Sequence, residues 1–149
     1  MSPYYKRKKL RLQGYDYTQG NTVFVTVCVE NRKMLLGEIL EPDTEGELPT
    51  VELSGIGKVV DQFTSTIRGI EKYVVMPNHV HMIVTNAEGE DISAKLRAWK
   101  SLITRQIGSS IWQRAFYDHV IRDEEDFRIR WKYIDDNPSK WAMDKYFQR

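Results

Sequence analysis

The strongest constraint on the fold is an alternation of strand patterns and helical patterns along a chain of 149 residues. The clearest strand is Thr22 to Glu30 (TVFVTVCVE), where valines at every second position alternate with Phe24, Thr26 and Cys28. Further strands are predicted at residues 73–76, 79–84 and 116–121. Such short, separated strands predict one sheet that is covered by helices rather than a helical bundle.

Helical patterns and one hairpin fill the intervals between these strands. Residues 35–53 surround the turn-rich segment EPDTEGELP and predict a small hairpin. Ser54 can cap a helix whose apolar residues recur every three or four positions. Asp91 and Asp123 can cap two more helices, and acidic residues follow Asp123 where the helix dipole favours them. The helix capped by Asp91 is predicted to bury an apolar stripe of Ile92, Leu96, Trp99 and Ile103.

The order of elements is therefore strand, hairpin, helix, two strands, helix, strand, helix. It predicts a single α+β domain over residues 1–149, with a ferredoxin-like antiparallel sheet, helices packed on one face and an additional C-terminal helix. A hydrophobic fraction of 41% is enough to build the core of one such domain. Because this fold hosts many functions, the function has to be argued from particular residues.

The charges are divided unevenly along the chain, although the net charge is only +1. Residues 35–53 carry six acids and no base, whereas residues 1–17 form a basic and aromatic arm in which tyrosines lie among cations. Aromatic planes and cations together suit a single-stranded nucleic acid. A solvated tail beside an acidic hairpin is the alternative interpretation. The cations of the arm are Lys6, Arg7, Lys8, Lys9 and Arg11.

The sequence also predicts the compartment. The N-terminus lacks the short apolar run of a secretory signal, and no stretch approaches the roughly 18 apolar residues of a membrane span. The single cysteine, Cys28, excludes an internal disulfide and a cysteine-rich zinc site. We therefore expect a reduced cytoplasmic protein with no membrane partner.

Two of the three histidines, His79 and His81, lie two positions apart in a predicted strand. Their side chains then share one face, about 6–7 Å apart, and can converge on one cation, while Val80 points to the other face. The alternative is a pair of partly exposed histidines on a sheet surface, because two ligands alone make a weak metal site.

The last predicted helix contains Tyr133, beside a buried stripe of Phe127, Trp131 and Ile134. A tyrosine hydroxyl can act as a nucleophile, but it is also a common polar tip on a helix that faces a core. Asn137 lies one turn later on the same side and can equally be read as the end of the helix. Neither residue alone supports a functional conclusion.

Three segments taken together are more specific: MPNHVHMIV, then WQRAFYDHVIRDEEDF, then YIDDNPSKW. In order and spacing they resemble the single-tyrosine HUH transposases, whose metal motif is His-hydrophobe-His, and in particular the REP-associated tyrosine transposase branch. The resemblance extends to the basic N-terminal segment and covers most of the chain.

The resemblance implies roles for four residues. His79 and His81 would bind a divalent ion, Mg²⁺ or Mn²⁺, and Tyr133 would be the nucleophile. Asn137 stands where the family supplies a further polar ligand, although many relatives have glutamine there. The implied reaction is cleavage and rejoining of single-stranded DNA, as in DNA transposition or REP-hairpin processing, through a 5′-phosphotyrosine intermediate.

The implied partner is single-stranded or hairpin DNA. The candidates for holding it are the five cations of the arm together with Arg114 and Arg122 near the last strand, and ordinary surface charge is the alternative for each. His119, in the matching YDHVIR strand, is expected to be structural or to face the substrate. The resemblance is compatible with a monomer or a homodimer.

Two competing functions follow from the same residues. The first is a non-catalytic ferredoxin-like module that binds single-stranded nucleic acid through aromatics, although the glycine and aromatic pattern of RNA-recognition domains is absent. The second is a zinc hydrolase or deaminase, for which the HxE and PCxxC signatures are absent.

Overall fold

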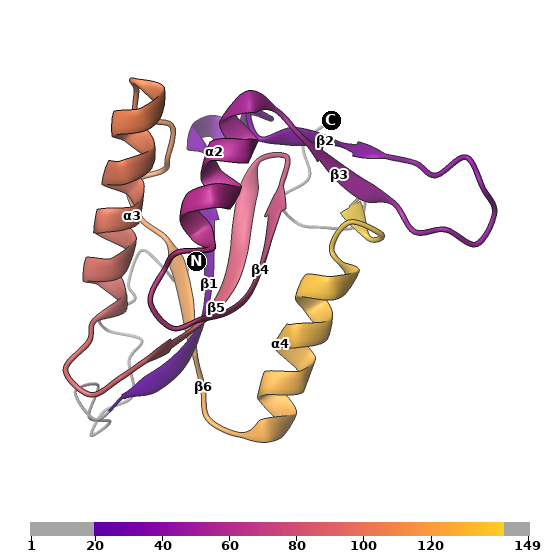
Figure 1. Ribbon diagram of the computed structural model, residues 1–149. Coiled ribbons are helices and arrows are strands. Elements are labelled where there is room, and N and C mark those ends of the chain that lie inside the picture. Colours follow the sequence, from indigo (N-terminus) through magenta and orange to yellow (C-terminus); the bar gives the residue numbers. More distant parts are fainter. Residues whose placement is uncertain (1–19, 142–149) are drawn as a thin grey trace.

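The computed structural model describes residues 20–141, and its centre is a four-stranded antiparallel sheet (Figure 1). The strands are β1 (Asn21–Cys28), β4 (Ile70–Met76), β5 (His79–Asn86) and β6 (Tyr117–Ile121), and they lie in the order β4-β5-β1-β6. Helix α2 (Gly55–Thr64) lies between β1 and β4 in the chain, α3 (Ile92–Ile107) between β5 and β6, and α4 (Glu124–Asp136) after β6. This βαββαβ order confirms the predicted ferredoxin-like α+β fold. The arm predicted at residues 1–17 lies outside the described residues, and a single domain over residues 1–149 stays a prediction.

The alternation along β1 assigns its side chains to the two faces of the sheet. Val23, Val25 and Val27 are buried in the larger hydrophobic core, which α2 and α3 cover. The matching residues of β5 are Val80, Met82 and Val84. The helices contribute Val60 from α2 and, from α3, the predicted stripe Ile92, Leu96, Trp99 and Ile103.

The opposite face of the sheet is covered by α4, which Figure 1 shows on the other side of the sheet from α3. Phe24 of β1 and Ile83 of β5 are buried there against Ile134 of α4. The additional C-terminal helix that the sequence predicts therefore packs on the face opposite α2 and α3. This second layer sets the position of the candidate site.

Local capping explains where the helices begin, as predicted. The hydroxyl of Ser54 accepts a hydrogen bond from the backbone N–H of Gly57 at 3.0 Å. Asp91 accepts from Ser93 in the same way, and Asp123 accepts from the N–H of Asp126 at 2.8 Å. Within residues 20–141, no helix is long and apolar enough to cross a membrane.

The predicted hairpin is formed by β2 (Gly37–Leu40) and β3 (Thr50–Leu53), and it extends away from the main sheet (Figure 1). Its connection to the body begins after the short 3₁₀ turn η3 (Glu30–Arg32). The backbone N–H of Leu36 donates to the oxygen of Pro77, and the N–H of Ser54 donates to the oxygen of Leu36. All six acids of the hairpin segment are exposed.

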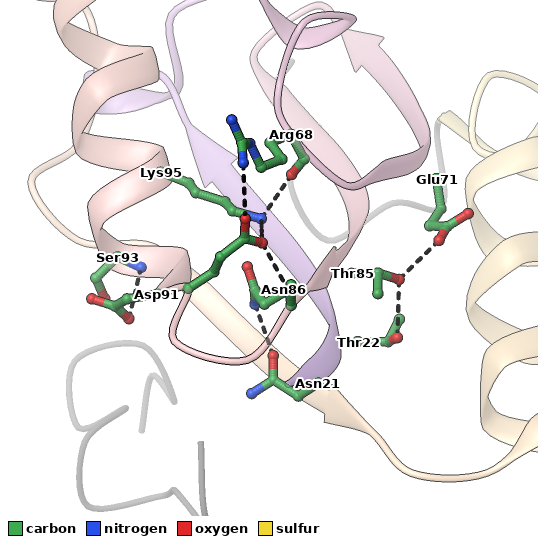
Figure 2. A network of polar contacts seen from close by, with 11 residues as sticks. Asn21, Thr22, Arg68, Glu71, Thr85, Asn86, Asp91, Ser93 and Lys95 are labelled. Carbon is green, nitrogen blue, oxygen red and sulfur yellow. Dashed lines mark hydrogen bonds and ion pairs between the residues drawn. The ribbon is translucent and has the colours of Figure 1, made fainter. Parts of the chain in front are cut away.

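A network of polar side chains joins the strands at the end of the sheet where β1 begins and β5 ends (Figure 2). Asn86, at the end of β5, donates from Nδ2 to Oδ1 of Asn21 at 2.7 Å. The hydroxyl oxygens of Thr22 and Thr85 are 3.1 Å apart. Because a strand rises about 3.3 Å per residue, this network lies roughly 20 Å from His79, at the start of the same strand. It stabilises the sheet without contacting the histidine pair.

Candidate nuclease site

His79 and His81 lie side by side on the face of β5 that α4 covers. Their ring centroids are 4.5 Å apart, with an angle of 70° between the ring planes. Both side chains are buried, with exposed fractions of 0% and 1%. The predicted shared face is therefore confirmed, and the alternative of two partly exposed histidines is wrong because α4 closes over this part of the sheet.

Each histidine ring is held through its Nδ1 atom. Nδ1 of His79 lies 2.7 Å from Oδ1 of Asn78, in the turn between β4 and β5. Nδ1 of His81 lies 2.8 Å from the hydroxyl of Thr26, its partner across the β1–β5 register. The Nε2 atoms of both rings are also buried. Neither contact was predicted, because the Thr26 contact depends on strand register and the Asn78 contact on the shape of a turn.

Tyr133 of α4 packs against the same pair of strands. Its ring centroid is 5.1 Å from that of His81 and 5.9 Å from that of Phe24, both in edge-to-face geometry. The residue is 38% exposed, so one side of it borders His81 and another borders solvent. The structure thus brings together the tyrosine and the histidines, which are about fifty residues apart in the sequence.

Asn137 and Trp141 follow Tyr133 at the end of α4. Asn137 is the C-cap residue of the helix, is only 3% exposed, and donates from Nδ2 to the backbone oxygen of Tyr133 at 2.9 Å. Its Oδ1 atom is buried and has no hydrogen-bond partner within residues 20–141. The indole of Trp141 stacks on His79, with 6.4 Å between centroids. No pattern in the sequence predicted the contact between Trp141 and His79.

Polar contacts fix α4 on the sheet on both sides of its buried residue Ile134. On one side, Nε2 of His119 lies 2.6 Å from Oδ2 of Asp126, which shows that His119 has a structural contact. On the other side, Lys72 of β4 forms a 2.7 Å ion pair with Asp135. These contacts set the position of the helix that carries Tyr133.

The electrostatics of the Asp126 contact favour its charged form. Burial raises the pKa of the Asp126 carboxyl, but hydrogen bonds and charge interactions with His119 and Arg130 outweigh burial and hold the pKa below its ordinary value. Arg130 forms a 3.2 Å ion pair with Asp126, and its guanidinium also lies 5.2 Å from the centre of the Phe24 ring.

Comparison with known proteins identifies the family. No protein-family model matches the sequence. Over 127 residues, however, the chain is 41% identical to the REP-associated tyrosine transposase of Escherichia coli (strain K12), covering 83% of this chain and 70% of the relative. The chain belongs to the REP-associated tyrosine transposase family. A putative REP-associated tyrosine transposase of Haemophilus influenzae is 26% identical over 142 residues, with 84% of this chain and 74% of the relative covered.

A solved structure supports the same membership in this transposase family. It is described as the REP-associated tyrosine transposase bound to a REP hairpin, and it matches this chain with a TM-score of 0.61 and 31% sequence identity. The match covers 90% of this chain and 77% of the other. The family membership predicted from the sequence motifs is therefore confirmed.

The donor atoms around the transposase histidines fit a divalent cation. Neutral imidazole nitrogens bind transition-metal ions, and an amide oxygen such as Oδ1 of Asn137 suits Mg²⁺ or Mn²⁺. The buried Oδ1 of Asn137, which lacks a hydrogen bond within the described part of the chain, is the observation that favours a further ligand there. Residues 20–141 contain no cluster of three or more His, Cys, Asp or Glu side chains that could hold a metal. Within this described part of the chain, the remaining ligands of an ion at this site would be an amide, water or substrate oxygen.

The predicted DNA-contacting arginines of this transposase-family chain lie toward different ends of β6. Arg114 precedes the strand at the end where Tyr117 pairs with Thr26, in the row of His81. Arg122 follows Ile121, at the opposite end of the strand. Both arginines are exposed. The five predicted arm cations lie outside the described residues.

Proposed function

We propose that this chain cleaves and rejoins single-stranded DNA next to a hairpin, with Tyr133 as the nucleophile and a divalent cation bound by His79 and His81. The observation that carries the proposal is the packing of the Tyr133 ring against His81, at 5.1 Å between centroids. The proposed nucleophile is therefore a neighbour of the two proposed metal ligands, which supports their joint action on one phosphodiester. Membership in a transposase family supports nucleic-acid processing in general, and the site supports this particular chemistry.

In the proposed reaction, the Tyr133 oxygen attacks the phosphorus of a phosphodiester and forms a new phosphorus–oxygen bond. The bond to the 3′ oxygen breaks, which leaves a 3′ hydroxyl and a 5′ end joined to Tyr133. A phenol has a pKa of about 10 in water, so its proton has to leave during the attack. Because Tyr133 is partly exposed, water can take that proton, and the leaving 3′ oxygen takes a proton from water to become the hydroxyl. A second 3′ hydroxyl can reverse the step and rejoin DNA without ATP.

The metal would be held by Nε2 of His79 and of His81, with Oδ1 of Asn137 as a further ligand. When bound, a divalent cation supplies positive charge to the phosphate oxygens and lowers the barrier by several kcal/mol. The contacts at Nδ1 orient the two imidazoles, and Trp141 covers His79. Asn137 is tied to the backbone of Tyr133, so the proposed ligand and the proposed nucleophile are fixed to the same helical turn.

The proposed substrate is a DNA hairpin with an unpaired segment at its foot. The related structure contains a REP hairpin, which supports hairpin DNA as the partner of this chain as well. A tyrosine on a helix that is packed against a sheet has little freedom to reach the phosphates of a regular duplex. The scissile phosphate is therefore proposed to lie in an unpaired segment. The basic arm and Arg114 are the candidate contacts to its phosphates.

The decisive experiment is covalent trapping. Purified protein is incubated with Mn²⁺ or Mg²⁺ and a labelled single-stranded oligonucleotide that carries a hairpin, and the adduct is detected on a denaturing gel. We expect Tyr133→Phe to abolish the adduct but to retain hairpin binding, because only one hydroxyl is lost. Tyr117→Phe is the matched control, because Tyr117 lies on the same sheet face and also contacts Phe24 edge-to-face. That variant keeps the adduct.

His81→Ala separates the roles of nucleophile and metal site. It should reduce both Mn²⁺ binding and adduct formation. If the Tyr133→Phe protein still forms the adduct, another residue is the nucleophile. If the wild-type protein binds the hairpin but forms no adduct with either ion, the non-catalytic binding module is the better description.

A further inference from the structure

We infer that Thr26 and Asn78 are positioning residues that fix both histidine rings in the tautomer able to bind a metal; this inference rests on the proposed function. Each of them contacts the Nδ1 atom of one ring, and both are deeply buried, with exposed fractions of 2% and 0%. A neutral imidazole carries its proton on one nitrogen and its lone pair on the other. A group that keeps the proton on Nδ1 therefore leaves the lone pair on Nε2, where it can bind a metal.

The orientation of the Asn78 side chain is set by the backbone before the hairpin. Nδ2 of Asn78 donates to the backbone oxygen of Arg32 at 3.3 Å, so Oδ1 is the atom that faces His79. Asn31 and Arg32 have left-handed backbone angles, with φ of 58° and 54°, in the short turn that presents this oxygen. A carboxamide oxygen can only accept, so Nδ1 of His79 has to donate. The lone pair of His79 is then on Nε2.

Thr26 plays the corresponding role for His81 across the sheet. The two residues are direct partners in the β1–β5 register, which places the hydroxyl 2.8 Å from Nδ1. A threonine hydroxyl can accept as well as donate, so it is compatible with a proton on Nδ1 of His81. We assign the acceptor role to Thr26, because both rings then present Nε2 lone pairs from the same sheet face. Contacts of this kind orient metal-binding histidines in proteins.

The first test is the tautomer of each ring in the metal-free protein, measured by ¹H–¹⁵N NMR at about pH 8, where ordinary histidines are neutral. In wild type we expect the proton on Nδ1 for both His79 and His81. Thr26→Val has nearly the same shape but no hydroxyl, so the tautomer at His81 alone should shift toward a proton on Nε2. Thr26→Ser restores a hydroxyl and should restore the wild-type spectrum.

Thr22→Val is the matched control for this series. Thr22 lies on the same strand and the same face, but its hydroxyl contacts Thr85, at the far end of the sheet (Figure 2). The same substitution there should leave both histidine tautomers unchanged. A proton on Nε2 of either ring in the wild-type protein would overturn the role of the residue at its Nδ1 atom.

The second test is Mn²⁺ affinity, measured by titration calorimetry without DNA. Loss of a contact that orients a metal ligand typically weakens metal binding by about 10–100-fold. We expect a loss in that range for Thr26→Val, recovery for Thr26→Ser and wild-type affinity for Thr22→Val. Equal affinity of the valine variant and wild type would refute the positioning role. If wild type binds no Mn²⁺, the proposed function fails at its metal site, while the NMR spectra still decide the tautomer assignment.

Discussion

The packing of α4 makes Ile134 the residue whose truncation most directly tests how the site is held together. Ile134 is 2% exposed and lies against Phe24 and Ile83, on the same face as the histidines. Replacing isoleucine with alanine removes three carbons, worth about 2.4 kcal/mol at 0.8 kcal/mol for each buried methylene. The cavity left behind raises the expected loss of unfolding free energy to about 3–4 kcal/mol.

Ile129→Ala is the matched control, because it is the same chemical change on the same helix at a residue that is 58% exposed. Urea unfolding should show a loss below about 0.5 kcal/mol for this variant. A similar loss for Ile134→Ala and Ile129→Ala would refute the reasoning, because α4 would then contribute little by packing on the sheet. In the still-folded fraction of Ile134→Ala, adduct formation should fall up to about 100-fold, because Tyr133 is no longer fixed.

Three further predictions test the fold and the DNA-binding surface. Gly57→Ala would place a Cβ atom 1.8 Å from a backbone oxygen, so the free energy of unfolding, measured by heat or urea, should fall by about 3 kcal/mol. A Cβ atom at Gly55 meets nothing within 4 Å, so Gly55→Ala should raise the free energy of unfolding by up to about 1 kcal/mol. Because the pKa of Asp126 is lowered in the folded protein, its contact with His119 stabilises the fold at pH values above the ordinary pKa of a carboxyl, and this stabilisation is lost as the pH falls through the lowered pKa. The Asp126→Asn protein lacks this titrating group, so its free energy of unfolding should fall less than that of wild type between about pH 6 and pH 3. Neutralising the cations in residues 6–11 should flatten the dependence of log K on log salt by about 0.7 for each lost phosphate contact to a single strand, and an unchanged slope would exclude the arm from DNA binding.

The parts of the fold that depend on neighbouring residues could be predicted from the sequence. The cap at Ser54 is an interaction between residues three apart, and the alternation of β5 needs only the geometry of a strand to place His79 and His81 on one face. For the same reason the apolar stripe of α3 was predicted residue by residue. These features follow from local periodicity and capping, which depend only on residues that are close together in the sequence.

The features that could not be predicted depend on long-range packing. Burial of the histidines requires α4 to return to the face opposite α2 and α3, and no local pattern specifies that choice. Thr26 reaches His81 only because of the register between strands 55 residues apart. His119 was expected to be structural or to face the substrate. Its contact with Asp126 could not be predicted, because it depends on how the loop after β6 places α4 beside the sheet.

The two faces of β5 differ: one is packed in the larger core, and the other carries the proposed metal ligands. Val80, Met82 and Val84 face the larger core, whereas on the other face His81 contacts Tyr133 of α4 and His79 contacts Trp141, which follows α4. The contacts that hold this helix include polar ones, such as His119 with Asp126, which can be exchanged for water at a lower cost than core packing. Loss of these polar contacts would therefore loosen α4 and Tyr133, while α2, α3 and the valines keep the sheet folded. Under the proposed function, the proposed metal ligands therefore lie on a strand of the packed sheet, and the proposed nucleophile lies on the helix that covers it.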